Sequence, residues 1–273
     1  MHTKVNGGAT VPVVSDYQTL IFEQSGPVAR IALNRPDAAN GMNDMMTREL
    51  AAVARRCDGP ATKAVVITGA GRFFCAGGDL KAVATSPMGP GPFVKSIADD
   101  LHRALSTFAR MDAVLITAVN GMAAGAGFSL GIAGDLVLAA ESAKFTMAYT
   151  KAGLSPDGGA TFYLPRIVGL RRAQELMLTN RTLSAAEAAE WGLVNEVVPD
   201  GALDEAAQEL AHRMAAGARG SAGAVKKLLL MSFANGLEEQ LEHESRQIGQ
   251  CADSPDGREG VDAFLSKRAA VFG

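Results

Sequence analysis

The sequence contains little of what metal, disulfide or nucleic-acid chemistry requires. Only three cysteines and four histidines occur among 273 residues, and the cysteines show no CxxC spacing, so we expect neither a disulfide framework nor a metal site. No run of Lys and Arg exceeds two residues and the formal net charge is -3. This balance argues against a nucleic-acid partner and against binding to a membrane.

Long apolar segments are also missing. A transmembrane helix needs about eighteen consecutive apolar residues, and no stretch of the chain holds so many. A secretory signal needs a cationic region followed by an apolar one, and the first residues show no such pattern. We therefore expect a cytoplasmic protein with a disordered leader over residues 1–16. A composition of 48% hydrophobic and 20% charged residues suits a globular core.

Strand-like and helix-like patterns alternate over most of the chain, which predicts an α/β fold. Short apolar or β-branched runs indicate buried strands, and apolar residues at helical spacing indicate amphipathic helices. A capping box from Ser184 to Glu187 opens one of the helices. Strands are expected over 19–24, 28–34, 64–68, 114–120, 136–140 and 192–198, and helices over 44–57, 93–110 and 185–191.

Two regions are expected after the leader. Residues 17–202 carry the alternating pattern and form the core, whereas residues 203–273 show only helical patterns. Breaks in this tail are expected at Gly220, Gly236 and the SPDG segment over 254–257. A helical appendage of this kind suits contacts between subunits.

An approximate internal repeat is the most informative feature of the core. Ile67-Thr68 leads to Ala76-Gly77-Gly78, and Ile116-Thr117 leads to Ala124-Gly125-Ala126. A strand that ends in small residues and opens a helix leaves backbone N–H groups free. Two such corners side by side would supply the amides of Gly78 and Ala126 to one carbonyl oxygen, which is an oxyanion hole. The alternative is that the glycines only permit tight packing.

Other glycine motifs fit less well. The third glycine of a dinucleotide-binding loop is missing after Gly125, and no GK[ST] follows a glycine run. The segment Gly127-Phe-Ser129-Leu-Gly131 matches the nucleophile elbow of serine hydrolases, with Asp157 and His212 or His243 following in the right order. An elbow must sit directly at a strand end, however, and Ser129 falls inside an expected helix. A serine hydrolase using Ser129 remains an alternative.

Six longer segments occur in a recognisable order: LNRPDAANGMN, GRFFCAGGDLK, AVNGMAAGAGFSL, AGLSPDGGATFYLPRIVG, LSAAEAAEWGLVNEVV and EGVDAFLSKR. Through them the chain, over residues 18–272, resembles the enoyl-CoA hydratase/isomerase (crotonase) superfamily. The resemblance implies a spiral of ββα units with a helical C-terminal trimerisation region. It also implies a homotrimer or a dimer of trimers that acts on an acyl-CoA thioester, with no tightly bound cofactor beyond the CoA of the substrate.

The resemblance also assigns site residues. Gly78 and Ala126 fall on the two amides of the family's oxyanion hole. Phe264 and Lys267 are similar to tail residues that reach CoA bound to a neighbouring subunit. The residues that fall where the family lines its pocket for the CoA adenine are Asn40, Gly41, Met42 and Ala76.

Two departures from the hydratase pattern affect the expected chemistry. Hydratases of the family carry glutamates where this chain has Ser129 and Tyr149. Neither side chain titrates near neutral pH, so neither can activate water or deliver its proton as a carboxylate does. An enoyl-CoA hydratase reaction would need an atypical mechanism.

Asp157 remains as the candidate acid and base. The segment from Pro156 to Gly159 is similar to ring-enoyl-CoA isomerases of phenylacetate degradation, in which an aspartate shuttles the proton. It is also similar to 4-chlorobenzoyl-CoA dehalogenase, in which the aspartate is the nucleophile and a histidine matching His102 is the base. We expect an enoyl-CoA isomerase, with the dehalogenase reaction as the alternative.

Structural roles compete with each catalytic assignment. Asp157 could be the N-cap of a helix beginning near Gly158, and Asp79 is expected to be a cap. His102 lies beside the apolar stripe of its helix, where a histidine is ordinarily a packing or surface residue. Tyr149 could donate a hydrogen bond to the substrate or form part of the pocket wall.

Overall fold

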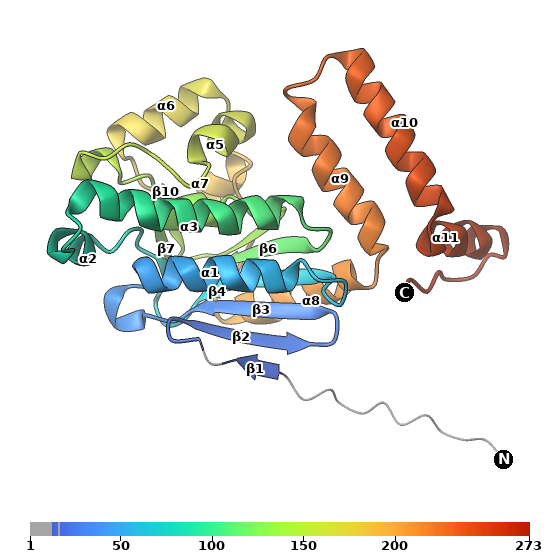
Figure 1. Cartoon of the computed structure of the whole chain (residues 1–273), viewed down its shortest axis with the longest axis horizontal. Helices are drawn as coiled ribbons and strands as arrows, with labels where there is room; N and C mark the ends of the chain where they lie inside the picture. The colour runs from blue at the N-terminus through green and yellow to red at the C-terminus, as the bar shows by residue number, and fades with distance from the viewer. Residues whose placement is uncertain (1–12, 16) are drawn as a thin grey trace.

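The computed structural model describes residues 13–15 and 17–273 (Figure 1). The strands are β1 (Val13–Ser15), β2 (Leu20–Ser25), β3 (Val28–Leu33), β4 (Ala64–Gly69), β5 (Phe73–Cys75), β6 (Val114–Val119), β7 (Met122–Ala124), β8 (Leu136–Ala140), β9 (Lys144–Thr146), β10 (Leu183–Ser184) and β11 (Glu196–Val198). The α-helices are α1 (Asp44–Cys57), α2 (Leu80–Thr85), α3 (Pro90–Arg110), α4 (Ala126–Gly131), α5 (Ala160–Val168), α6 (Leu170–Thr179), α7 (Ala185–Glu190), α8 (Leu203–Ala215), α9 (Arg219–Ser232), α10 (Leu237–Asp253) and α11 (Pro255–Leu265).

The strands form two sheets. The larger has the order β1-β2-β3-β4-β6-β8-β11, and the smaller has the order β10-β9-β7-β5. Strands β3, β4, β6, β8 and β11 run parallel to one another, as do β5, β7 and β9, whereas β2 pairs with β3, and β10 with β9, in antiparallel fashion. Each turn of the chain therefore adds one strand to each sheet before a helix follows. The expected α/β spiral of ββα units is confirmed.

Local sequence accounts for the main elements. All six residues of β6 are buried, as expected for a parallel strand covered on both faces. Helix α1 begins where the side chain of Asn43 accepts a hydrogen bond from the backbone N–H of Met46. At α7 the predicted capping box between Ser184 and Glu187 is present.

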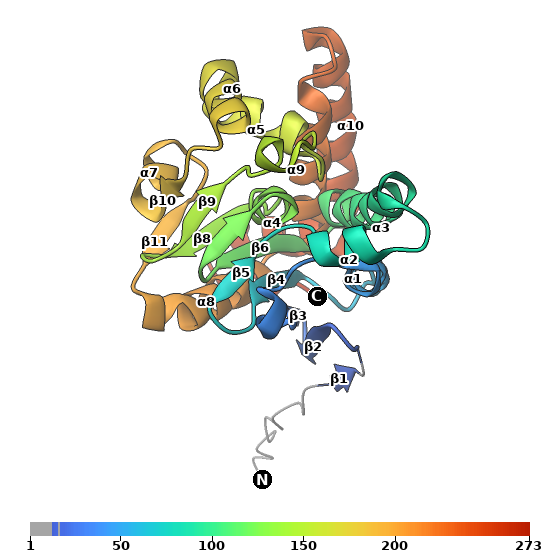
Figure 2. The ribbon, with the colours of Figure 1, turned by 90° about the vertical axis from the view of Figure 1, so that its left-hand side faces the viewer.

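Helices cover the larger sheet and extend away from it. Helices α1 and α3 pack against each other, whereas α8 packs against β4, β6 and β8 from the other side of the sheet (Figure 2). Helices α9, α10 and α11 form an arm at one end of the molecule (Figure 1), and α9 contacts α3. The predicted all-helical region after residue 203 is therefore present. None of the described helices is long and apolar enough to cross a membrane.

Several sequence-based boundaries need correction. Within the predicted leader, β1 pairs with β2, so disorder was wrongly expected for residues 13–15; the rest of that leader lies outside the described residues. Gly220 lies inside α9 and does not separate two helices. The strand expected over 192–198 is only β11, because Leu193 and Asn195 make loop hydrogen bonds before it begins.

A buried lysine ties α9 to the core. Lys226 is 8% exposed, and its ammonium group donates to the carbonyl oxygens of Phe108 at 2.8 Å and Ala113 at 2.7 Å. The carboxylate of Asp135 lies 2.8 Å away. Burial lowers the pKa of Lys226 and raises the pKa of Asp135, and the charge pairing partly offsets both effects.

Replacing Lys226 with methionine should destabilise the fold. Lys226→Met leaves the Asp135 carboxylate and two carbonyl groups without their partner, and breaking a buried pair in this way costs about 3–5 kcal/mol. Lys227→Met is the matched control, because Lys227 pairs with Asp112 and its side chain is 45% exposed; it should cost about 1 kcal/mol or less. Urea unfolding at one protein concentration measures both. Equal losses would contradict the anchoring role of Lys226.

Candidate active site

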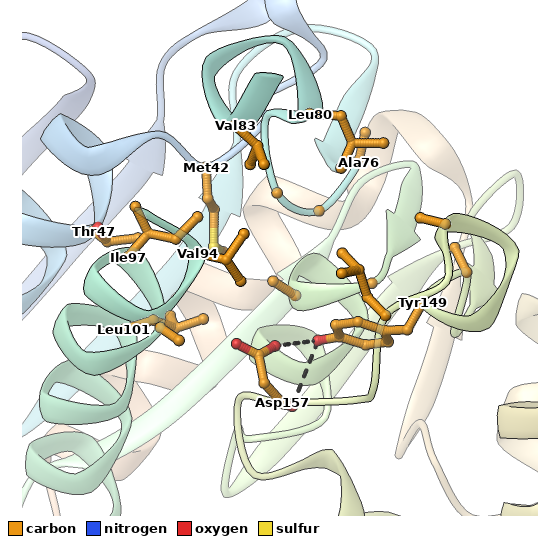
Figure 3. A pocket seen from close by; sticks show the side chains of 18 of the residues that line it. Met42, Thr47, Ala76, Leu80, Val83, Val94, Ile97, Leu101, Tyr149 and Asp157 are labelled. Atoms are coloured by element: carbon orange, nitrogen blue, oxygen red, sulfur yellow. Dashed lines mark hydrogen bonds between the residues drawn. The ribbon is translucent and has the colours of Figure 1, made fainter. Parts of the chain in front are cut away.

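A cavity of about 310 Å³ lies where the ends of β5 and β7 meet helix α3 (Figure 3). The loop before α5 closes it from the other side. Its volume falls within the range of ordinary small-molecule sites. Its lining residues are Met42, Thr47, Ala76, Gly77, Gly78, Leu80, Val83, Val94, Ile97, Ala98, Leu101, Gly125, Ala126, Ala148, Tyr149, Ala152, Leu154, Ser155 and Asp157.

The two repeated glycine corners touch each other at this cavity. Gly77 has a φ of +99°, and a Cβ on it would lie 2.8 Å from the carbonyl oxygen of Ala124 and 3.5 Å from the nitrogen of Ala126. Only glycine permits this approach. Cys75 is completely buried beside the corner, and burial raises the pKa of its thiol to about 12. The thiol is therefore a packing group.

The two corners leave one backbone amide each available. The bridge between Met42 and Gly78 is made by Met42 donating to Gly77 and by Asp79 donating to Met42. The N–H of Gly78 takes no part in it. Gly125 donates to Thr146, and the N–H of the following residue, Ala126, has no assigned acceptor among residues 13–15 and 17–273. Two unused donors thus line one cavity, as an oxyanion hole requires.

The Asp157 carboxylate lines the same cavity and is held by a tyrosine. Tyr149 donates its phenolic O–H to Asp157 Oδ1 at 2.6 Å (Figure 3). Burial raises the pKa of Tyr149, and the neighbouring charge of Asp157 raises it further. The phenol therefore stays protonated as a donor at physiological pH. Asp157 keeps part of its surface accessible, since its side chain is 28% exposed.

Ser129 forms a hydrogen bond with the backbone of Asp157. Its hydroxyl donates to the backbone carbonyl of Asp157 at 2.9 Å and lies 2.9 Å from the Tyr149 hydroxyl. The residue is fully buried inside α4. None of the hydrogen bonds described for Ser129 involves a histidine, so the geometry offers no support for a nucleophilic serine.

His102 contacts the loop that carries Asp157. Its Nε2 accepts the backbone N–H of Gly158 at 3.0 Å. The same nitrogen lies 3.7 Å from Asp157 Oδ2, which is too far for a hydrogen bond. His102 is absent from the cavity lining and faces an outer hollow on α3.

Comparison with known proteins identifies the family. A family model described as enoyl-CoA hydratase/isomerase matches residues 23–273. The chain belongs to this family. A 1,2-epoxyphenylacetyl-CoA isomerase of Escherichia coli (strain K12) is 41% identical, with 90% of this chain and 94% of that protein covered. A 4-chlorobenzoyl coenzyme A dehalogenase of an Arthrobacter species is 36% identical over 93% of this chain and 92% of the relative.

Solved structures of the family share the fold. A crystal structure of an enoyl-CoA hydratase from Polaromonas sp. JS666 superposes with a TM-score of 0.88 at 31% identity, covering 93% of this chain and 99% of that one. The fold is therefore the crotonase-type spiral with a helical C-terminal region. The names of these relatives divide among isomerase, dehalogenase and hydratase, so family membership establishes an acyl-CoA enzyme and leaves its reaction open.

The four residues predicted to line a pocket for the CoA adenine differ in their relation to this cavity. Met42 and Ala76 line it. Asn40 and Gly41 are not among its lining residues. The Asn40 side chain is buried and donates to the carbonyl oxygens of Ala70 and Phe73. The Asn40 amide therefore stabilises the loop instead of facing the cavity.

The predicted tail residues lie far from the cavity of their own chain. Helix α11, which carries Phe264, is at the opposite end of the molecule from α2 (Figure 1). Phe264 is 83% exposed, and Lys267 follows α11 with a φ of +52°. Within one chain, neither residue contributes to the cavity.

Asp157 and Asp79 are both candidate helix caps in the sequence, and the structure shows this role for Asp79 alone. Asp157 is not a helix cap: α5 begins at Ala160, its N-cap is Gly159, and no side chain caps it. The Asp157 carboxylate instead accepts the hydrogen bond from Tyr149. Asp79 does cap α2, by accepting the N–H of Ala82.

The side wall of the cavity could not be identified from the sequence. Val94, Ile97 and Leu101 lie on the helix expected over 93–110, and the structure shows that their side chains face the cavity (Figure 3). Helical periodicity marks a buried face but cannot say whether protein or ligand covers it. The polar lining residue Thr47 gave no signal at all, because a lone threonine within a helix is common.

Removing one corner amide should reduce turnover. Gly78→Pro deletes the unused N–H without touching the bridge hydrogen bonds, and loss of one oxyanion-hole donor costs about 2.7–4 kcal/mol in the transition state. Gly78→Ala is the control, since nothing lies within 4 Å of the added Cβ and the N–H is kept. Steady-state kinetics on an acyl-CoA substrate measures both. Full turnover by a folded Gly78→Pro protein would exclude the oxyanion hole.

Proposed function

We propose that this chain is an enoyl-CoA isomerase, in which Asp157 moves a proton between two carbons of an unsaturated acyl-CoA. One observation carries the proposal. Among the described residues, Asp157 is the only carboxylate that lines the cavity holding the two unused amides. A single carboxylate is enough for isomerisation, because the group that takes the proton can return it elsewhere.

The proposed reaction runs through an enolate. The thioester oxygen accepts hydrogen bonds from the N–H groups of Gly78 and Ala126, so negative charge that develops on this oxygen is stabilised. Asp157 removes a proton from one carbon, and the electron pair shifts toward the thioester as the double bond moves. The protonated carboxyl group then delivers the same proton to another carbon. Neither water nor a redox group is consumed, and CoA takes part only as a portion of the substrate.

Tyr149 and Ser129 act on Asp157 in this proposal. The O–H of Tyr149 occupies Oδ1, which leaves Oδ2 to face the substrate carbon. Ser129 holds the backbone carbonyl of Asp157. Side chains that hold a catalytic group in one orientation maintain the short approach that proton transfer requires.

The geometry disfavours hydration. Hydration needs groups that activate water and protonate carbon, and the two positions where the family's hydratases carry glutamates hold Ser129 and Tyr149. Space at Ser129 is also restricted, because a Cβ on Gly158 would lie 2.8 Å from the Ser129 Cβ. A longer carboxylate side chain at position 129 would require the loop to move.

The dehalogenase reaction is the second candidate, since the Arthrobacter relative carries that name. It would use Asp157 as a nucleophile and a histidine as the base for water. His102 is poorly placed for this role, because it does not line the cavity and its Nε2 is occupied by Gly158.

The cavity wall favours an apolar acyl group. Helix α3 contributes Val94, Ile97 and Leu101, and helix α2 contributes Leu80 and Val83. An acyl chain or ring without charged substituents matches such a lining, because burying an unpaired charge there would be costly.

Replacing Asp157 with asparagine should abolish turnover and preserve substrate binding. The amide cannot accept a proton from carbon, while its size and its contact with Tyr149 are nearly unchanged. Mass spectrometry on a panel of acyl-CoA thioesters separates an unchanged mass from gain of water and from loss of halide. Asp204→Asn, which alters an exposed carboxylate paired with Arg30, is the control.

Labelled water distinguishes the two candidate reactions. Isomerisation incorporates no oxygen from ¹⁸O water into product or protein. A nucleophilic Asp157 would acquire the label in its carboxylate during turnover and pass it to a hydroxyaryl product. Labelled product together with halide release would overturn the isomerase proposal, and undiminished turnover by Asp157→Asn would remove Asp157 from the reaction.

We further propose that the active assembly is a trimer or a dimer of trimers in which Phe264 and Lys267 reach CoA on a neighbouring subunit. Exposure of Phe264 supports this arrangement, because a large aromatic side chain at the surface is a common interface residue. The exposed surface of helices α9, α10 and α11 would then be covered by another subunit.

Changing the two tail residues should weaken CoA binding. The double variant Phe264→Ala, Lys267→Ala should raise the Kd for CoA, with Ser266→Ala as the adjacent control. If the site is shared between subunits, mixed oligomers of this variant with Asp157→Asn subunits contain sites with an intact Asp157 and an intact tail, and these sites bind CoA more tightly than those of the double variant alone. Calorimetry and co-expression test the two points. Unchanged affinity in the double variant would contradict the tail assignment.

A further inference from the structure

The peptide unit between Asp157 and Gly158 is held at both ends by side chains. Its carbonyl oxygen accepts the hydroxyl of Ser129 at 2.9 Å, and its N–H donates to Nε2 of His102 at 3.0 Å. Gly158 and Gly159 follow with φ values of +60° and +76°. We call these two hydrogen bonds, from Ser129 and to His102, the clamp. They fix the orientation of the peptide plane from which the Asp157 side chain extends into the cavity.

The His102 end of the clamp works in only one protonation state. An imidazole nitrogen accepts a hydrogen bond only when it carries no proton, so the Gly158 contact requires neutral His102 with its proton on Nδ1. A protonated ring would present an N–H to the N–H of Gly158, and two donors repel. The same N–H would be drawn to Asp157 Oδ2, which lies 3.7 Å away and is the oxygen that the proposed reaction needs to face the substrate.

We propose that His102 is a positioning residue whose neutral form holds Asp157 in its working orientation, and that proton uptake by His102 releases the clamp. Enzyme turnover then falls as the solution becomes acidic. This proposal rests on the proposed function for the role of Asp157 in turnover, whereas the clamp itself exists without substrate. It differs from a catalytic histidine, because His102 touches neither the cavity nor the reacting atoms.

The surroundings of His102 let solvent protons reach it from outside. Its side chain is 48% exposed and faces an outer hollow of about 520 Å³. The charged groups that face it are Asp99 and Arg103 on its own helix, Arg55 on α1, and Asp157 on the loop. Charges of both signs therefore surround the ring.

Two substitutions at position 102 distinguish the loss of the hydrogen-bond acceptor for Gly158 from the effect of protonation. His102→Gln supplies an amide oxygen that accepts the Gly158 N–H at every pH. It should keep most of the wild-type kcat and move the acid limb of the kcat profile to lower pH. His102→Leu offers no acceptor and should lower kcat on the order of ten- to a hundredfold at all pH values with KM little changed, as misplacement of a catalytic group does. Ser106→Ala, one turn further along α3, should behave as wild type.

The clamp is also observable without substrate. Four Asp-Gly pairs occur in the chain, so labelling with 1-¹³C-aspartate and ¹⁵N-glycine reduces the spectrum to their amides, and the Gly158 signal is the one missing in Asp157→Asn. In wild-type protein this amide should shift as His102 titrates. In His102→Gln it should stay constant over the same pH range.

Specific outcomes would overturn the proposal. A Gly158 amide that does not respond to His102 titration excludes the clamp, whatever reaction the enzyme catalyses. His102→Gln as inactive as His102→Leu would identify the imidazole as a chemical participant, and wild-type kcat in a folded His102→Leu would show that the contact is only structural. If no isomerisation is found but the amide titrates, the clamp stands and the proposed reaction fails.

Discussion

The contact between the two glycine corners is the constraint on which the site depends. Gly77 approaches the carbonyl of Ala124 so closely that any Cβ would collide with it. Because the corners meet, the amides of Gly78 and Ala126 line one cavity. The parallel pairing of β5, β7 and β9 in the smaller sheet maintains this alignment, and the larger sheet and helices support those strands.

A second constraint concerns Asp157, which lies on a loop and not on a regular element. Loop carboxylates need outside support to keep one orientation. Three elements provide it here: Tyr149 binds the carboxylate, Ser129 binds the backbone carbonyl, and His102 binds the following N–H. Ser129 and Tyr149 are neutral and buried, and both contribute hydrogen bonds that position the carboxylate of a neighbouring loop.

Much of the fold could be predicted because its signals are local. The cap at Asn43 and the capping box at Ser184 mark where helices begin, and apolar runs mark the strands of the larger sheet. The three-residue strands of the smaller sheet were not predicted, since so few residues show no period. Gly220 was misjudged as a break because a glycine in the first turn of a helix resembles one that separates two helices.

The sequence by itself determined the family, the two glycine corners and Asp157 as a candidate, because chemical identity and order along the chain are sufficient for these. Only the tertiary structure decided which residues share a cavity. It separated Asn40, whose amide binds backbone carbonyls, from Met42, which lines the cavity. It also showed that the Asp157 carboxylate binds Tyr149 and does not cap a helix, a role that the sequence had left possible. The physical reason is that hydrogen-bond partners distant in sequence, such as His102 and Gly158, are selected by packing, which no local pattern records.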